Sequence, residues 1–356
     1  MNINDLGWDK HFSEHFESLG RSDFLPARVL LETARVYSVF CSSGELSAKI
    51  SGKLVHKASG REDFPVVGDW VAIKPNSTEQ KATIHRILPR RSAFIRKEAG
   101  KRTEPQVVAA NIDTVFMVCG LDGDFNPNRI ERYLAVAWES GAKPVVVLNK
   151  TDICADVDDA VATVESLVPG IPVLPMSAIK NIGVDTLCAH IRFGETVAFL
   201  GSSGVGKSSL VNALLGMERQ RVRTVRGDDS RGRHTTVHGQ LFVLPEGGVL
   251  IDTPGLRELQ LWSDNEGLAR AFDDIKELSS QCRFKNCRHD TEPGCAVRQA
   301  LEDGTLTDRR WQSYMKLKNE LSHLEGRRNT KSKLVEKKRK KDLSAHIKRV
   351  HKRPRT

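Results

Sequence analysis

Long apolar runs are missing from this sequence of 356 residues. A membrane-spanning helix needs about 20 consecutive apolar residues, and no stretch of the chain approaches that length. The first residues, MNINDLGWDKHFSEHF, also lack the basic and then apolar layout of a secretory signal. We therefore expect a soluble, cytoplasmic protein without a membrane partner.

Cysteine is scarce as well, with seven residues in the chain, four of which stand singly. The other three, Cys282, Cys287 and Cys295, surround His289 with the spacing C-x4-C-x-H-x5-C. This spacing is typical of metal ligands rather than of a secreted disulfide framework. Three thiolates and one imidazole predict a closed tetrahedral Zn²⁺ site, which is structural because no position is left for water. Free thiols or a redox pair are the alternatives.

An excess of positive charge is missing from most of the chain, although the formal net charge is +10. Residues 327–356 hold 14 Lys and Arg against 2 Asp and Glu, so the rest of the chain is close to neutral. This basic tail (residues 327–356) is low in complexity and highly charged. We expect it to be disordered in isolation and suited to contacts with phosphates.

The remaining sequence divides into segments of different pattern, and the fold class that it predicts is multidomain. Residues 1–95 are predicted to form an N-terminal region with a small β-barrel over about 33–90, because short β-branched runs alternate there with turn signals. Five or so strands suit an oligonucleotide-binding (OB)-like barrel. Another small barrel, or a spacer with no binding role, remains open.

A strand–helix–strand rhythm follows over residues 96–262 and predicts a central α/β domain of six strands in a largely parallel sheet. Residues 263–326 are predicted to form a helical zinc-binding domain, with helices over 268–279 and 308–325 on either side of the Cys/His cluster. The basic tail ends the chain.

A phosphate-binding loop is predicted where G-x-x-x-x-G-K-[ST] stands between the apolar run TVAFL and a helical segment. Its glycines let backbone N–H groups turn toward phosphates, and the next helix offers its positive end. Lys207 is expected to reach the β and γ phosphates, as a catalytic residue, and Ser208 to bind Mg²⁺. The predicted nucleotide contacts are Gly201, Ser202, Ser203, Gly204, Val205, Gly206, Lys207, Ser208 and Ser209.

A guanine-reading sequence is predicted after the apolar run KPVVVL, where Asn149, Lys150, Thr151 and Asp152 fit N-K-x-D. A carboxylate at Asp152 can accept hydrogen bonds from the guanine N1–H and amine, which adenine lacks. Ser177-Ala178 follows the next apolar run, where a GTPase commonly offers a backbone N–H to the guanine oxygen.

The γ-phosphate side of the site is predicted at Asp252-Thr253-Pro254-Gly255, which fits D-x-x-G after the run GVLI. There Asp252 would hold Mg²⁺ through water and the Gly255 N–H would contact the γ-phosphate. The polar segment 225–237 resembles a switch loop in which Thr235 or Thr236 completes the Mg²⁺ shell. An ordinary solvated loop would have the same composition.

The motifs stand in an unusual order: N-K-x-D, Ser-Ala, phosphate loop, Thr loop, D-T-P-G. Ordinary small GTPases begin with the phosphate loop, so the domain is predicted to be circularly permuted, which preserves the three-dimensional site. The segment after Gly255 then leads directly into the C-terminal part of the chain. A water-orienting Gln is also missing after D-x-x-G, where Leu256 stands. His234 is the candidate to replace it, with a group supplied by a binding partner or a role in loop packing as alternatives.

With these motifs assembled, the sequence resembles the bacterial ribosome small-subunit-dependent GTPase A family (RsgA, also called YjeQ or YloQ). The barrel, the permuted order, GRHTT at 232–236, D-T-P-G and the Cys/His cluster carry the resemblance over almost the whole chain. It implies a late maturation factor of the 30S ribosomal subunit, whose GTP hydrolysis is stimulated by the ribosome and coupled to release. The implied cofactors are GTP or GDP, Mg²⁺ and one structural Zn²⁺, and the implied partners are the 30S subunit and its rRNA, bound by a monomer.

Two other functions remain open from the sequence. The chain could be an RNA-binding module whose GTP site regulates affinity and rarely hydrolyses. An ATPase of DNA metabolism is disfavoured by Asn149 and Asp152, which are suited to guanine.

Overall fold

The computed structural model describes residues 1–33, 36–76, 79–97, 105–123, 125–216, 239–253, 256, 261 and 265–326. Five sequence predictions therefore lie outside the described residues: the switch-loop residues His234, Thr235 and Thr236, the γ-phosphate contact Gly255, and the basic tail.

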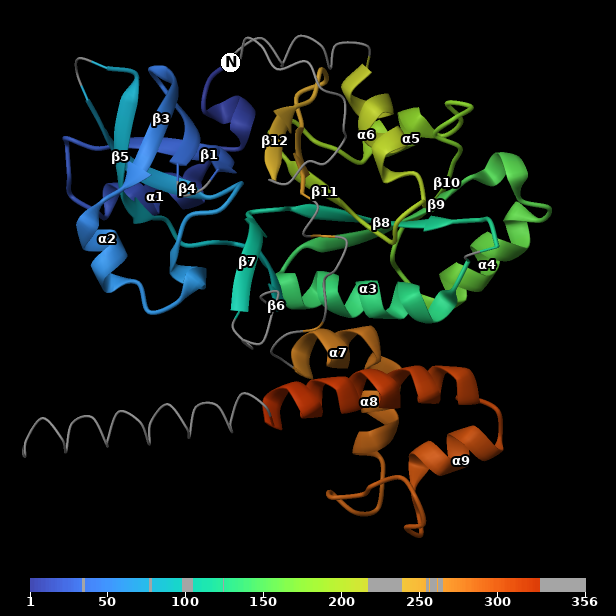
Figure 1. Cartoon of the computed structure of the whole chain (residues 1–356). Coiled ribbons are helices and arrows are strands. Elements are labelled where there is room, and N and C mark those ends of the chain that lie inside the picture. The colour runs from blue at the N-terminus through green and yellow to red at the C-terminus, as the bar shows by residue number, and fades with distance from the viewer. Residues whose placement is uncertain are drawn as a thin grey trace, which may run out of the picture.

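A five-stranded barrel forms the N-terminal part of the molecule (Figure 1). It closes because β1 pairs with both β2 and β4, while β3 and β5 run parallel. Alternate residues such as Val29, Val39 and Ile84 fill its core. The strands are β1 (Leu25–Thr33), β2 (Val36–Cys41), β3 (Gly44–Ile50), β4 (Trp70–Pro75) and β5 (Lys81–Ile87).

The barrel differs from the sequence prediction in two details. Its first strand begins at Leu25, before the expected start near residue 33. The second half of the segment 46–55 is helical rather than extended and forms α2 (Gly52–Lys57), because the Ser51 side chain accepts a hydrogen bond from the Leu54 N–H and caps the helix.

An N-terminal segment that was not predicted packs against the barrel at the start of β4. It contains η1 (Asn4–Leu6) and α1 (Lys10–Glu17), which Asp9 caps. The rings of Trp8 and Phe12 pack against buried Trp70 at the start of β4. This aromatic contact fixes the segment to the barrel.

The central domain is a six-stranded sheet in the order β10–β9–β8–β11–β13–β12. All neighbours in it are parallel except β12, which runs antiparallel to β13. Every residue of β8 is buried, as expected for a strand covered on both faces. The strands are β8 (Thr114–Gly120), β9 (Lys143–Asn149), β10 (Val173–Pro175), β11 (Thr196–Leu200), β12 (Gln240–Val243) and β13 (Val249–Asp252).

Helices cover both faces of this sheet, with α3 and α4 on one side and α5 and α6 on the other (Figure 1). Local signals set the bounds of α3: Asn126 caps it, Pro127 opens it and Gly141, at φ 85°, ends it. The helices are α3 (Pro127–Ser140), α4 (Val157–Leu167), α5 (Val184–Ala189) and α6 (Lys207–Leu215).

Two connections join the barrel to the central sheet. Strand β1 pairs with β12 at Leu31 and Gln240, so one continuous sheet runs through both. A hairpin that was not predicted, β6 (Ala93–Lys97) and β7 (Pro105–Ala110), lies between them in the chain. The turn before β4 includes η2 (Arg61–Asp63), which contacts β7.

The C-terminal module, residues 265–326, lies below α3 in Figure 1. It contains α7 (Asn265–Ala271), α8 (Asp273–Ser280), α9 (Ala296–Glu302) and helical residues 308–326. The single helix predicted over 268–279 is two helices, because fully buried Phe272 adopts a non-helical conformation between them. Helix α7 packs closely on α3, since a Cβ at Gly267 would lie 2.5 Å from the carbonyl oxygen of Ala135.

Within the described parts of the chain, we find no helix with the length and apolar character needed to cross a bilayer.

Candidate functional site

The predicted phosphate loop lies between β11 and α6, and its glycines are required by the backbone. Gly204 and Gly206 have φ angles of 84° and 99°, which side chains other than glycine rarely adopt. A Cβ at Gly201 would lie 2.5 Å from the carbonyl oxygen of Val118, in β8. The loop is therefore pressed against the carboxyl edge of the central sheet, where ligands of such sheets bind.

Lys207 begins α6 and folds back over this loop. Its ammonium group donates to the carbonyl oxygen of Gly201 at 2.6 Å and also to that of Ser202. A positive charge is thus held at the mouth of the loop, next to the N-terminus of α6. Incoming phosphate oxygens would compete with those two carbonyls for the ammonium group.

Asn149 connects three segments of the site. Its Nδ2 donates to the Val205 carbonyl at 2.8 Å, and its Oδ1 accepts from the Ala178 N–H at 3.0 Å. A Cβ at Gly206 would lie 2.2 Å from this Nδ2. The phosphate loop, N-K-x-D and Ser-Ala segments are therefore joined through one buried amide.

Asp152 and Ser177, both predicted to lie in the base site, are side by side. The Ser177 hydroxyl donates to Asp152 Oδ1 at 2.5 Å and accepts from the Lys180 N–H at 3.2 Å. Asp152 is in the short helix η3 (Thr151–Ile153), and the Thr151 N–H donates to the Met176 carbonyl at 3.1 Å. The hydrogen bond from Ser177 therefore orients the Asp152 carboxylate through its Oδ1 atom.

Lys150 forms an ion pair with a residue that the sequence analysis did not single out. Its backbone is left-handed, at φ 71°, and its ammonium group pairs with the carboxylate of Asp122. Asp122 stands two residues after the end of β8. Because parallel strands bring their carboxyl ends to the same edge, that position was a signal from which Asp122 could have been found.

Asp252 ends β13 next to the phosphate loop. Ile251, the residue before it, pairs with Ala198 of β11, and β11 runs into the loop. Asp252 is half-buried at this edge. Leu256 is buried in the apolar core, so its position after D-x-x-G offers no polar group to a water molecule.

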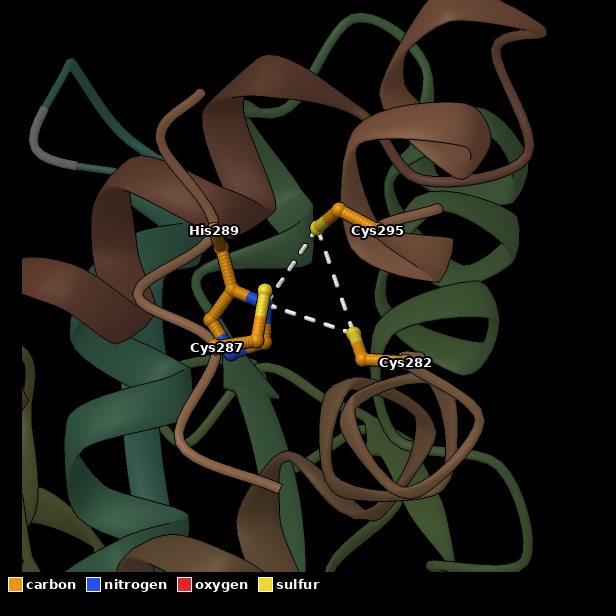
Figure 2. A group of neighbouring side chains, drawn as sticks. All are labelled: Cys282, Cys287, His289 and Cys295. Carbon is orange, nitrogen blue, oxygen red and sulfur yellow. Dashed lines mark hydrogen bonds between the residues drawn. The ribbon is translucent and has the colours of Figure 1, made fainter. Parts of the chain in front are cut away.

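The four predicted zinc ligands converge in the C-terminal module (Figure 2). Their ligand atoms all lie within 4.8 Å of one another. His289 Nδ1 is 3.6 Å from the sulfur of Cys282 and 3.5 Å from that of Cys295, and those two sulfurs are 3.9 Å apart. Three sulfurs and one nitrogen at these separations fit the donor set and the size of a tetrahedral zinc site.

Burial and hydrogen bonds shift the pKa values of the side chains in this cluster. Burial raises the pKa of Cys282, but hydrogen bonds from the N–H groups of Val297 and Ala296, together with those of the two neighbouring thiols, lower it overall. Desolvation raises the pKa of Cys287 to about 11, with the neighbouring thiols adding to the rise. Desolvation also lowers the pKa of His289, which favours the neutral imidazole that a metal requires.

Two residues outside the motif contact the imidazole ring of His289. Its Nε2 lies 3.5 Å from the hydroxyl of Ser279, which itself donates to the Ile275 carbonyl at 2.7 Å. The ring of Trp311 contacts the imidazole edge to face, with centroids 5.7 Å apart. Such contacts orient a metal-binding histidine, and sequence spacing did not indicate them.

A model of the RsgA GTPase family matches residues 87–262. A model of the ABC transporter family matches residues 184–345, a range that includes the phosphate loop. Among curated proteins, the "Small ribosomal subunit biogenesis GTPase RsgA 1" of Oceanobacillus iheyensis is 43% identical, over 98% of this chain and 99% of that protein. The "Small ribosomal subunit biogenesis GTPase RsgA" of Opitutus terrae is 47% identical, over 91% and 90%.

Solved structures agree with this result. The crystal structure of YjeQ from Thermotoga maritima matches with a TM-score of 0.63 and 28% identity, over 84% of this chain and 98% of that one. The structure of YloQ, described as a circularly permuted GTPase, matches with a TM-score of 0.61 and 24% identity, over 85% and 96%, and supports the fold.

Proposed function

The chain belongs to the RsgA GTPase family, and from that premise we propose that it hydrolyses GTP during the biogenesis of the small ribosomal subunit. The observation that carries the proposal is the buried amide of Asn149, which holds the phosphate loop and the Ser-Ala segment at one edge of the sheet. This contact supports the proposal that the phosphate loop and the guanine motif bind one and the same nucleotide.

In this proposal Asp152 reads the guanine N1–H and amine, and the Ala178 N–H lies near the guanine oxygen. Lys207 would exchange the loop carbonyls for the β and γ phosphates. Ser208, and Asp252 through water, would hold Mg²⁺, which when bound would supply positive charge to the phosphates. Thr235 or Thr236 and Gly255 complete the γ-phosphate side.

Hydrolysis needs a group that orients water, and Leu256 is apolar and buried. We propose that His234 or a group of the small subunit supplies this role. The chain alone would then be a slow GTPase, and the partner would accelerate it.

Binding to the partner would use the parts outside the nucleotide domain. We propose that the barrel region (residues 1–95), the zinc-binding domain (263–326) and the basic tail (327–356) contact 30S rRNA, while residues 96–262 form the GTPase domain. One Zn²⁺ would be held by Cys282, Cys287, His289 and Cys295. The protein would act in the cytoplasm as a monomer.

The test is GTP turnover measured with 30S subunits, with 50S subunits and with no particle. The proposal expects selective acceleration by 30S. An RNA-binding module with a regulatory GTP site would instead bind 30S without faster turnover, and that result would overturn the proposal.

A further inference from the structure

The first turn of α3 contacts the phosphate loop on one side. Arg129 donates from Nη1 to the hydroxyl of Ser202 at 3.0 Å. The carbonyl of the same Ser202 accepts from the ammonium group of Lys207. Ser202 therefore lies between Arg129 and the lysine that phosphate would attract, so a nucleotide entering the loop would change its surroundings.

The same turn contacts the C-terminal module on its other side. Glu131 is fully buried and accepts from Arg309 at 3.1 and 3.2 Å and from Arg310 at 3.0 Å. Arg310 also pairs with Asp274, at the start of α8, at 2.6 and 2.7 Å. A buried carboxylate without its partners would be strongly destabilising, so this contact holds the module on α3.

Two further contacts lie alongside. Arg309 donates to Asn128 Oδ1 at 2.6 Å, and Arg132 donates to Glu320 Oε1 at 2.7 Å. Residues 128–132 thus hold the helical segment 308–326 at several points. That segment carries Trp311, which packs on the zinc-site histidine.

We propose that Arg129 is a positioning residue that couples the phosphate loop to the C-terminal module through the first turn of α3. When Lys207 moves to a phosphate, Ser202 is released from it and the Arg129 contact shifts. The turn that holds Arg309 and Arg310 shifts with it, which loosens the segment 308–326. The inference deepens the proposed function, because it describes how the same nucleotide site would regulate the surface that meets the partner.

The coupling can be measured in the free, full-length protein by hydrogen exchange of peptides from 308–326. With saturating non-hydrolysable GTP analogue, we expect these peptides to exchange about 5-fold or more faster than without nucleotide, in the range typical of coupling between sites. Ligand binding alone would slow exchange, so acceleration is diagnostic.

Substitutions assign the coupling to Arg129. Arg129→Gln should abolish the nucleotide-dependent acceleration, and Arg129→Lys should retain part of it. Arg298→Gln is the matched control: Arg298 pairs with Glu302 on the surface of α9 and should leave the acceleration intact. If Arg129→Gln does not fold, Ser202→Ala removes the same hydrogen bond from its other end.

Two results would overturn the inference. One is a wild-type protein whose 308–326 peptides exchange no faster with bound analogue, and the other is full acceleration in folded Arg129→Gln or Ser202→Ala. Neither result depends on ribosomal particles. Loss of 30S-stimulated turnover in the wild type would instead overturn the proposed function and leave the coupling measurement valid.

Discussion

Asp152 is the residue on which base selectivity depends in the proposed site. Asp152→Asn would replace an acceptor of the guanine N–H groups with an amide that also donates, so GTP should bind about 10- to 100-fold more weakly. Xanthosine triphosphate, which carries an oxygen in place of the guanine amine, should bind better than GTP. Competition of the two nucleotides against a fluorescent analogue measures the preference.

The variant should fold, because the amide oxygen of the new side chain can still accept from Ser177. Asp158→Asn, the same change on the exposed first turn of α4, is the control and should leave GTP preferred. Unchanged base preference in Asp152→Asn would remove Asp152 from the base site.

At the scale of elements, the Cys/His cluster joins the ends of the loop between α8 and α9. Purified protein should contain about one zinc per chain, because three thiolates and one imidazole make a closed site. Cys282→Ser or Cys295→Ser should lose the metal and unfold the loop, since metal binding supplies the folding free energy of such sites. Elemental analysis and thermal unfolding with a chelator measure both effects.

Cys188→Ser, at a half-buried thiol in α5 outside the cluster, should retain the zinc. A wild-type protein that is folded and free of metal would contradict the prediction.

The elements that could be predicted from sequence were those with a strong local pattern. The predicted fold class, with a small barrel, a circularly permuted GTPase fold and a Cys/His cluster compatible with zinc, is confirmed. The buried runs of β8 and β9 are continuous and apolar, so they were found. Strand β1 was missed because Pro26 and buried Arg28 interrupt its apolar pattern, and α9 because it has seven residues.

Contacts between distant segments could not be predicted in the same way. Lys150 and Asp122 belong to different loops, and Arg129 meets Ser202 across 73 residues of sequence. Motifs indicate which residues belong to a site, but such partners depend on how the sheet brings loops together. Their roles, and the motif residues' own contacts with nucleotide, stay predictions.

At the scale of the whole molecule, the excess of positive charge is concentrated in the basic tail. Deleting residues 327–356 should weaken binding to 30S subunits and flatten its dependence on salt, because fewer counterions are released when fewer phosphates are contacted. Affinity measured at several salt concentrations gives both quantities. A tail of equal length with each Lys and Arg changed to Gln should behave like the deletion.

GTP binding without ribosomal particles should be the same in all three proteins, since the predicted site uses no tail residue. Equal 30S affinity and equal salt slope with and without the tail would show that it takes no part.

Arg28 lies where the N-terminal segment, the barrel and the central sheet meet. It is fully buried and donates to the carbonyls of Leu6, Gly68 and Asn111 and to the Thr196 hydroxyl. Burial lowers its pKa to about 10, which leaves it charged at neutral pH. Its donors therefore satisfy acceptors on both sides of the junction at once.

Together with the β1–β12 pairing, the contacts of Arg28 fix the orientation of the barrel relative to the central sheet. If the barrel turned against the central sheet, a buried guanidinium would lose its acceptors, which is strongly unfavourable. A partner bound by the barrel would then keep a constant distance and angle from the nucleotide throughout the catalytic cycle.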